Sequence, residues 1–238
     1  MRQIVLDTET TGLVPQEGHR IIEVGAIEIV NRRPTGRTYH QYLNPDREID
    51  AGAVEIHGIT NAMLADKPRF GDVALALIEF IDGAELVIHN APFDVGFLNA
   101  EFAHALSAGV ALPGRQVEDF CTVLDTLKLA RSLHPGQKNN LDALCRRYSI
   151  DNSRRAMHGA LLDAEILVDV YLAMTGGQIS LFLEDHAKTD VVVVEDFGGE
   201  EGGAVVVAPS ALELAAHEAY LDLLDKKTGG RCLWRVLG

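Results

Sequence analysis

Hydrophobic residues in the first third of the chain follow the two-residue period of β-strands. Residues 3–8 form a short apolar run, and residues 20–30 mostly alternate, with two glutamates among β-branched side chains. The polar residues 31–33 predict a hairpin, and residues 38–43 predict its returning strand. We therefore expect an antiparallel meander, in which strand 20–30 is buried on one face only.

The hydrophobic period then changes to that of helices separated by short apolar strands. Helical spacing covers five segments: 70–81, 93–106, the stretch that Asp125 caps and that runs to Leu133, 141–148 and 160–174. Apolar strands are expected at 85–89 and 121–124. This order predicts an α/β fold, in which a mixed sheet combines the antiparallel meander with later parallel strands and is flanked by helices.

The composition changes after residue 177, so we expect residues 1–177 to form one domain that is followed by a flexible C-terminal tail. Residues 184–209 contain four glycines and seven carboxylates against one lysine, which is typical of a flexible acidic linker. Two runs of valine within this linker could still order on a partner. Ser210 then offers an N-cap for a helix through Leu224.

Composition also limits the compartment and the partners of the protein. No apolar run is long enough to cross a bilayer, and the N-terminus lacks the pattern of a signal peptide. Cys121, Cys145 and Cys232 are far apart, which favours reduced, buried thiols in a cytoplasmic protein without membrane contact. The net charge of −14 argues against a broad basic face that grips nucleic acid.

Three clusters of polar residues carry candidate chemistry. Asp7 and Glu9 close the first strand, and because alternate residues point the same way, their carboxylates can share a hard cation. Asp94 lies in the first turn of a helix, where a carboxylate also suits the helix dipole. Asp163 lies among leucines and is costly to bury without a partner such as a metal, and His158 precedes its helix. Taken alone, each cluster is better explained without catalysis: the first as a solvated strand end, the second as a stabilised helix start, and the third as an exposed histidine with an aspartate on a solvated helix face.

In combination, the three clusters resemble those of the DEDDh exonucleases of the ribonuclease H-like fold, over residues 1–177. The matching segments are 4–12, 56–59, 141–145 and 158–164, and in the tail 214–218 and 232–234. Together they are similar to the family members that proofread for bacterial replicative DNA polymerases. The resemblance implies removal of nucleotides from the 3′ end of DNA as 5′-monophosphates.

The same resemblance implies a cofactor of two divalent cations, Mg²⁺ or Mn²⁺, and a role for each clustered residue. By this resemblance, Asp7 bridges the two ions, Glu9 and Asp163 complete the site of one ion, and Asp94 supports the other ion. His158 takes the proton from the attacking water, because an imidazole has a pKa near working pH. Clustered carboxylates that hold cations also reverse the local field of an acidic protein.

The resemblance further implies that His57 lies near the terminal nucleotide, with Asp7, Glu9 and Asp163 also in contact with the substrate. From the residues alone, His57 fits a surface-loop histidine as well. Where some relatives carry a glutamate five residues before this histidine, the chain has Gly52, and so lacks one side chain of the family's nucleotide site.

Two segments after the domain predict protein partners. Residues 178–183 resemble the peptide that docks on the sliding clamp, through Gln178, Ser180, Leu181 and Phe182, although a simple exit from the last helix also fits. Residues 210–238 are expected to bind the polymerase alpha subunit, with docking on the chain's own domain as the alternative. Trp234 and an apolar helix surface carry this prediction: Ala211, Leu212, Leu214, Ala215, Ala219, Leu221, Leu223 and Leu224.

Two other functions are compatible with parts of this pattern. A stand-alone DEDDh nuclease that trims RNA would share the catalytic residues but would need neither a docking peptide nor a linker. A non-catalytic scaffold between polymerase and clamp would keep the tail but would not need the intact set of five site residues.

Overall fold

The computed structural model describes residues 1–155, 157–176, 209–228 and 234. The chain divides into two units, Met1–Asp185 and His186–Gly238, which are considered separately. The proposed clamp peptide, the linker up to residue 208, and Cys232 lie outside the described residues.

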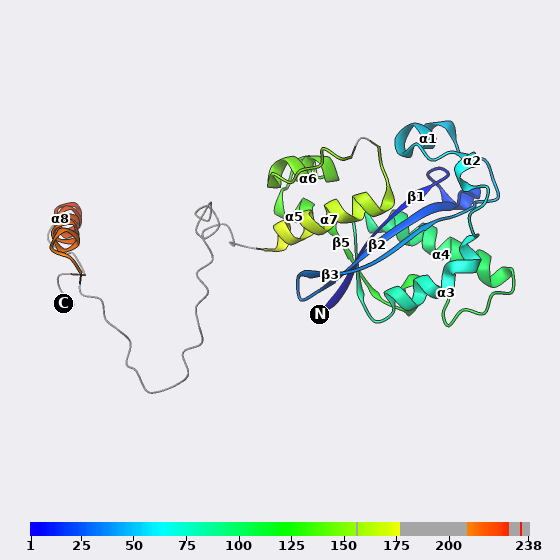
Figure 1. Cartoon of the computed structure of the whole chain (residues 1–238), viewed down its shortest axis with the longest axis horizontal. Coiled ribbons are helices and arrows are strands. Elements are labelled where there is room, and N and C mark those ends of the chain that lie inside the picture. Colours follow the sequence, from blue (N-terminus) through cyan, green and yellow to red (C-terminus); the bar gives the residue numbers. More distant parts are fainter. Residues whose placement is uncertain (156, 177–208, 229–233, 235–238) are drawn as a thin grey trace, which may run out of the picture. The chain divides into compact units, whose positions relative to one another are not determined.

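One five-stranded mixed sheet forms the centre of the first unit (Figure 1). Its strands are β1 (Arg2–Thr10), β2 (Ile21–Val30), β3 (Arg33–Tyr42), β4 (Glu85–Ile88) and β5 (Thr122–Asp125), in the order β3-β2-β1-β4-β5. The first three pair as an antiparallel meander, and β4 and β5 add in parallel to β1. The predicted α/β fold is therefore confirmed.

Helices occupy both faces of this sheet. They are α1 (Ala51–His57), α2 (Asn61–Leu64), α3 (Phe70–Ile81), α4 (Ala91–Ser107), α5 (Thr126–Leu133), α6 (Leu141–Tyr148) and α7 (Ala160–Thr175), with short 3-10 turns at Pro15–Glu17 and Val117–Asp119. As predicted, the Asp125 side chain caps α5, accepting hydrogen bonds from the backbone N–H groups of Leu127 and Lys128.

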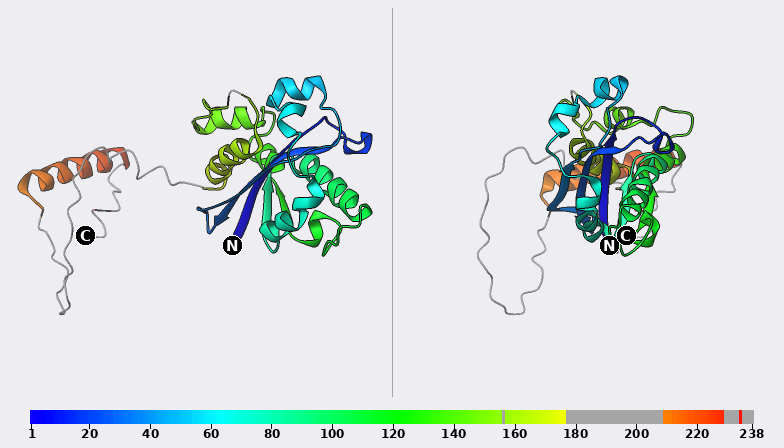
Figure 2. Two further views of the ribbon diagram at one scale, coloured as in Figure 1. Left: turned by 45° about the vertical axis from the view of Figure 1, so that its right-hand side comes forward. Right: turned by 90° about the vertical axis from the view of Figure 1, so that its right-hand side faces the viewer.

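Alternation along β1 divides the hydrophobic core into two layers. Ile4 and Leu6 pack with α3 and α4 on one face, whereas Val5 packs with α6 and α7 on the other. The two views of Figure 2 show the sheet between these helical layers. A further small cluster under α1 and α2 contains Ile22 and Leu64.

The expectation that β2 is half-buried is wrong. Nine of its ten residues are buried, including Glu23 and Glu28. Both carboxylates have partners, since Glu28 pairs with Arg2 and Arg37, and Glu23 contacts His40. Alternating polar residues in this strand therefore mark buried ion pairs rather than a solvent-exposed face.

The described part of the second unit contains α8 (Ala211–Thr228). Ser210 begins this helix as predicted, exchanging hydrogen bonds with Glu213, and the helix continues four residues beyond Leu224. In the part of the chain that the structure describes, each helix is too short or too polar to cross a membrane. Cys121 and Cys145 are buried free thiols, as expected.

Candidate active site

The end of β1 places the first candidate residues. By alternation, Asp7 and Glu9 share the α7 side of the strand, and Thr8 points to the α4 side. The Thr8 hydroxyl donates a 2.7 Å hydrogen bond to Asp94 Oδ1, which fixes the first turn of α4 against the strand. The pairing of β1 with β2 shifts register between Glu9 and Thr10, a bulge of the kind that often lies beside active sites.

The start of α7 is held against β2 by two residues that the sequence analysis did not identify. Gly25 lies opposite Asp7, and a Cβ atom on it would be 2.2 Å from the backbone nitrogen of Leu161. Glu23 accepts a hydrogen bond from the backbone N–H of Ala160 at 3.1 Å, and so caps the helix. The helix can therefore approach β1 closely enough to bring Asp163 beside Asp7 and Glu9.

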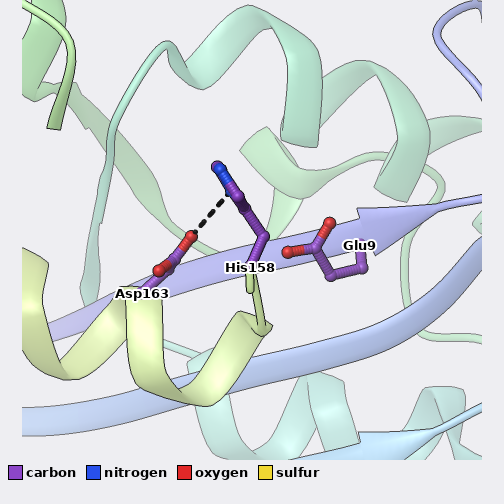
Figure 3. Close-up of side chains that lie close together, drawn as sticks. All are labelled: Glu9, His158 and Asp163. Atoms are coloured by element: carbon purple, nitrogen blue, oxygen red, sulfur yellow. Dashed lines mark ion pairs between the residues drawn. The ribbon is translucent and has the colours of Figure 1, made fainter. Parts of the chain in front are cut away.

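These elements enclose a cleft of about 740 Å³. It is lined by all five residues that the sequence predicted for the catalytic site: Asp7, Glu9, Asp94, His158 and Asp163. Glu9, His158 and Asp163 each place a potential ligand atom within 4.8 Å of the others. Figure 3 shows these three side chains extending from β1 and from the start of α7 into one space.

Three of the carboxyl groups in the cleft, those of Asp7, Glu9 and Asp94, have raised pKa values. Burial raises the pKa of Glu9 to about 8 and that of Asp94 to about 7. Burial, together with the carboxylates of Asp94 and Glu9, raises the pKa of Asp7 well above its ordinary value. A grouped set of oxygen ligands whose mutual repulsion a cation would relieve fits a hard divalent metal ion.

Arg155 is the main site residue that the sequence analysis missed. Burial raises the pKa of Asp163, but the hydrogen bonds and the charge of Arg155, together with the neighbouring His158, outweigh this effect, and the pKa is lowered overall. The guanidinium contacts both oxygens of Asp163 at 2.5 and 2.7 Å. The partner that a buried Asp163 was predicted to need is therefore an arginine in this structure.

His158 lies just before α7, with its side chain 43% exposed. Its backbone N–H donates to the carbonyl oxygen of Ile56 at 3.2 Å, and its Nδ1 lies 3.2 Å from Asp163 Oδ2. These two contacts hold the ring of His158 beside the carboxylate of Asp163.

A second, more apolar pocket of about 450 Å³ adjoins the cleft at Glu9 and Phe93. His57 and Gly52 line it from α1. His57 is buried, so the surface-loop interpretation is wrong. Its Nδ1 accepts a hydrogen bond from the backbone N–H of Ile59, and burial lowers its pKa. At Gly52, open space surrounds the position of a Cβ atom.

The candidate clamp residues Gln178, Ser180, Leu181 and Phe182 lie outside the described residues. In the proposed polymerase-binding tail, the described side chains include exposed leucines at positions 212, 214 and 223, and Trp234 is 75% exposed.

Comparison with solved structures agrees with this fold. Exonuclease X, in a complex with 5′-overhanging duplex DNA, is 30% identical with a TM-score of 0.52, covering 74% of this chain and 94% of that chain. The zinc-bound complex of Escherichia coli exonuclease I with single-stranded DNA has a TM-score of 0.64 at 20% identity, over 76% of this chain and 42% of that chain. The second likeness supports the fold alone.

Comparison of sequences is more specific. The exonuclease family model (RNase_T) matches residues 4–171. The DNA polymerase III subunit epsilon of Pasteurella multocida is 52% identical over 244 residues, covering 98% of this chain and 93% of that protein. The subunit of the same name from Escherichia coli K12 is 50% identical over 243 residues, covering 99% and 98%. The chain therefore belongs to the exonuclease family and, within it, to the epsilon subunits of DNA polymerase III.

Proposed function

We propose that this protein is the proofreading 3′→5′ exonuclease subunit of a bacterial replicative DNA polymerase. It hydrolyses 3′-terminal nucleotides of DNA to 5′-monophosphates in the cytoplasm. The observation that carries the proposal is the convergence of four carboxylates and His158 on one cleft. Similarity to epsilon subunits over nearly the whole chain supports it further.

Asp7, Glu9, Asp94 and Asp163 are the residues that would hold two divalent cations, Mg²⁺ or Mn²⁺. When bound, such ions activate a water and stabilise the leaving 3′ oxygen. The end of β1 positions three of these carboxylates, because the strand carries Asp7 and Glu9 and its Thr8 holds Asp94 by a hydrogen bond. In this proposal hydrolysis takes place at the junction of β1, α4 and α7.

His158 is proposed as the general base, and the second pocket as the place of the terminal nucleotide. The partly exposed imidazole of His158 lies beside Asp163, within reach of water in the cleft. The second pocket joins the cleft at Glu9, and His57 lies in its wall. A terminal base held there would direct the last phosphodiester towards the carboxylates.

The tail is proposed to recruit the protein to its substrate. In this proposal residues 178–183 bind the sliding clamp, residues 184–209 act as a tether, and residues 210–238 bind the polymerase alpha subunit. The exposed leucines of α8 support the last assignment, because apolar side chains that are exposed together on a helix indicate a surface that binds another protein. A tether would give the nuclease a high effective concentration at the primer end.

The test is digestion of primer–templates with paired and mispaired 3′ ends, each labelled at the 5′ or at the 3′ terminus, with RNA in parallel. We expect stepwise shortening of the DNA primer from its 3′ end, faster on the mispair, with release of 5′-monophosphates. Preferential digestion of RNA would instead identify a stand-alone RNA nuclease. If neither DNA nor RNA is hydrolysed with Mg²⁺ or Mn²⁺, the protein would instead be a non-catalytic scaffold between polymerase and clamp.

A further inference from the structure

Arg155 contacts both groups that the proposed mechanism requires to be available. Its side chain is only 8% exposed. Nε and Nη2 donate to the two carboxylate oxygens of Asp163 at 2.5 and 2.7 Å, and Nη2 also lies 2.9 Å from Nδ1 of His158. Nη1 donates to Asp142 Oδ1 at 2.7 Å. One guanidinium therefore joins Asp163, His158 and Asp142.

The hydrogen bond from Arg155 determines which ring nitrogen of a neutral His158 carries the proton. Arginine has only hydrogen-bond donors, so Nδ1 of His158 accepts in its 2.9 Å hydrogen bond with Arg155. The longer, 3.2 Å contact of the same Nδ1 with Asp163 Oδ2 is then not a hydrogen bond. A neutral imidazole that accepts at Nδ1 carries its proton on Nε2. One ring nitrogen is then occupied by Arg155 and the other by its own proton. In this arrangement His158 has no free lone pair to offer a water, and cannot act as a base until Arg155 releases it.

The same contact bears on Asp163. Its two oxygens form a paired, charge-assisted interaction with Arg155, so a cation that binds Asp163 meets a positive charge already in place. Asp142 gives Arg155 a second anchor: its side chain is 42% exposed and extends from the first turn of α6. Arg155 can therefore leave Asp163 without losing every carboxylate partner.

We propose that Arg155 is a positioning residue that couples metal occupancy to the availability of His158. In the metal-free site it holds Asp163 and the Nδ1 lone pair of His158 together. Arg155 releases both when Asp163 takes up a divalent cation, and it stays anchored on Asp142. This inference rests on the proposed function, because it assigns Asp163 to the metal and His158 to the proton.

The first test measures metal affinity by calorimetric titration of the full chain with Mn²⁺. Replacement of Arg155 by glutamine removes the competing charge, so R155Q is expected to bind Mn²⁺ about ten-fold more tightly than the wild type. The matched control is R154Q. Arg154 is the neighbouring residue, its side chain is 76% exposed, and it pairs with Glu165 at 3.3 Å. The Mn²⁺ affinity of R154Q should equal that of the wild type.

The second test reads the His158 tautomer directly from ¹⁵N shifts of the histidine rings at a pH where they are neutral. The His158→Ala variant assigns the signals. In the metal-free wild type, His158 should be held as the Nε2–H tautomer. Saturation with Mg²⁺, or the R155Q substitution without metal, should give a mixture of both tautomers. A structural role of Arg155 alone would leave this signature unchanged.

The proposal is wrong if R155Q binds Mn²⁺ no more tightly than the wild type, or if metal-free His158 carries its proton on Nδ1. Should R155Q fail to fold, R155K replaces it: lysine keeps the charge but cannot span Asp163 and His158 together. A fixed Nε2–H tautomer in R155K would equally refute the proposal. Failure of the wild type to digest DNA would refute the proposed function, whereas an active wild type with unchanged R155Q affinity refutes only this inference.

Discussion

At the scale of single residues, the site is a cluster of like charges that the fold holds together. Asp7 and Glu9 lie two residues apart on β1, and Asp163 approaches them from α7. Burial is the main reason why the pKa of Asp7 is raised, and repulsion from the neighbouring carboxylates adds to it. The folded metal-free protein therefore binds protons that the unfolded chain would already have released.

This linkage predicts how Asp7→Asn changes stability with pH in EDTA. A carboxyl whose folded pKa is raised stabilises the fold below its unfolded pKa of about 4 and loses that contribution as pH rises. In the wild type, this stabilising contribution should continue to fall up to about pH 8, because the pKa of Glu9 is raised to about 8. Chemical denaturation should show D7N more stable than the wild type by about 1–3 kcal/mol at pH 8, but not at pH 4.

The control for this prediction is Asp66→Asn, whose carboxylate is 79% exposed beside Lys67. The stability of D66N relative to the wild type should not increase as the pH rises. D7N should also lose cleavage in saturating Mg²⁺ while remaining folded. Near-normal turnover of D7N, or of Glu9→Ala, would remove these residues from the catalytic site.

His158 is predicted to act as a base rather than as a metal ligand, although its position near Glu9 and Asp163 is compatible with either role. His158→Ala should lower the rate by a factor of about 10²–10⁴, the usual contribution of general-base catalysis. Its Mn²⁺ affinity should stay close to that of the wild type. Strongly weakened Mn²⁺ binding in calorimetry would make His158 a ligand.

At the scale of secondary-structure elements, local pattern predicted most of the fold. The helices at 70–81 and 141–148 have the predicted bounds, because the apolar spacing that predicts them is contained in the segments themselves. The short helices α1 and α2 were not predicted, since one or two turns show too little period. The five catalytic candidates were found because their spacing along the chain resembles a family pattern.

The residues that position the site could not be found in this way. Glu23 and Gly25 act through contacts with a segment far away in the sequence. Arg155 lies before the start of α7, and its partners are 3 to 13 residues away. None of the three belongs to a recognisable motif. A glutamate in an alternating strand predicts solvent exposure, whereas Glu23 is buried and caps α7 from 137 residues away. Gly25 in a strand signals close packing in general but does not identify its partner.

Gly25→Ala is therefore predicted to disturb catalysis from outside the cleft. The added Cβ would meet backbone atoms of Ala160 and Leu161 at 2.2–2.4 Å, and the backbone of α7 cannot rotate away as a side chain can. We expect a loss of about 1–3 kcal/mol in the free energy of unfolding, the usual cost of overpacking. Displacement of Asp163 should also lower the rate by about 10²-fold.

The matched control is Gly96→Ala in the middle of α4, where the position of a Cβ atom is open. There alanine should raise the free energy of unfolding by about 0.5–1 kcal/mol through helix propensity, with activity retained. Equal behaviour of the two variants in denaturant titration would show that α7 does not depend on Gly25 for its position.

At the scale of the whole molecule, an acidic protein must still hold a polyanionic substrate. Arg131, in the last turn of α5, lines the same cleft as the carboxylates. Within the described residues it makes no hydrogen bond or ion pair, whereas Arg155 is fully engaged. We therefore predict that Arg131 pairs with a phosphate of the DNA backbone.

Arg131→Ala is expected to raise KM for single-stranded DNA about ten-fold with little change in kcat, because a charge-assisted contact made equally in ground and transition states is lost. Arg33→Ala is the control, because Arg33 begins β3 at the end of the sheet away from Asp7 and Glu9. Steady-state kinetics at fixed salt measure both variants. An unchanged KM in R131A would place the DNA backbone elsewhere.

The proposed role of the tail is to bind the polymerase. Four large apolar side chains of α8 are exposed, namely Leu212, Leu214, Tyr220 and Leu223. Exposed apolar groups of this size on one helix favour association with another protein. Because the family model ends at residue 171, the catalytic chemistry and this surface belong to separate segments of the chain.

Truncation after Leu183 is therefore predicted to separate recruitment from chemistry. The truncated protein keeps β1, α4 and α7 with all five site residues, so it should degrade single-stranded DNA at close to the full-length rate. It should no longer co-elute with the polymerase alpha subunit in size-exclusion chromatography, because residues 210–238 are gone. Substitution of Leu212 and Leu223 by serine in the full chain should reproduce this loss without truncation, since both side chains are exposed and leave the nuclease fold unchanged. If truncation instead removes nuclease activity and thermal stability together, the tail packs on the catalytic unit and the tether is refuted.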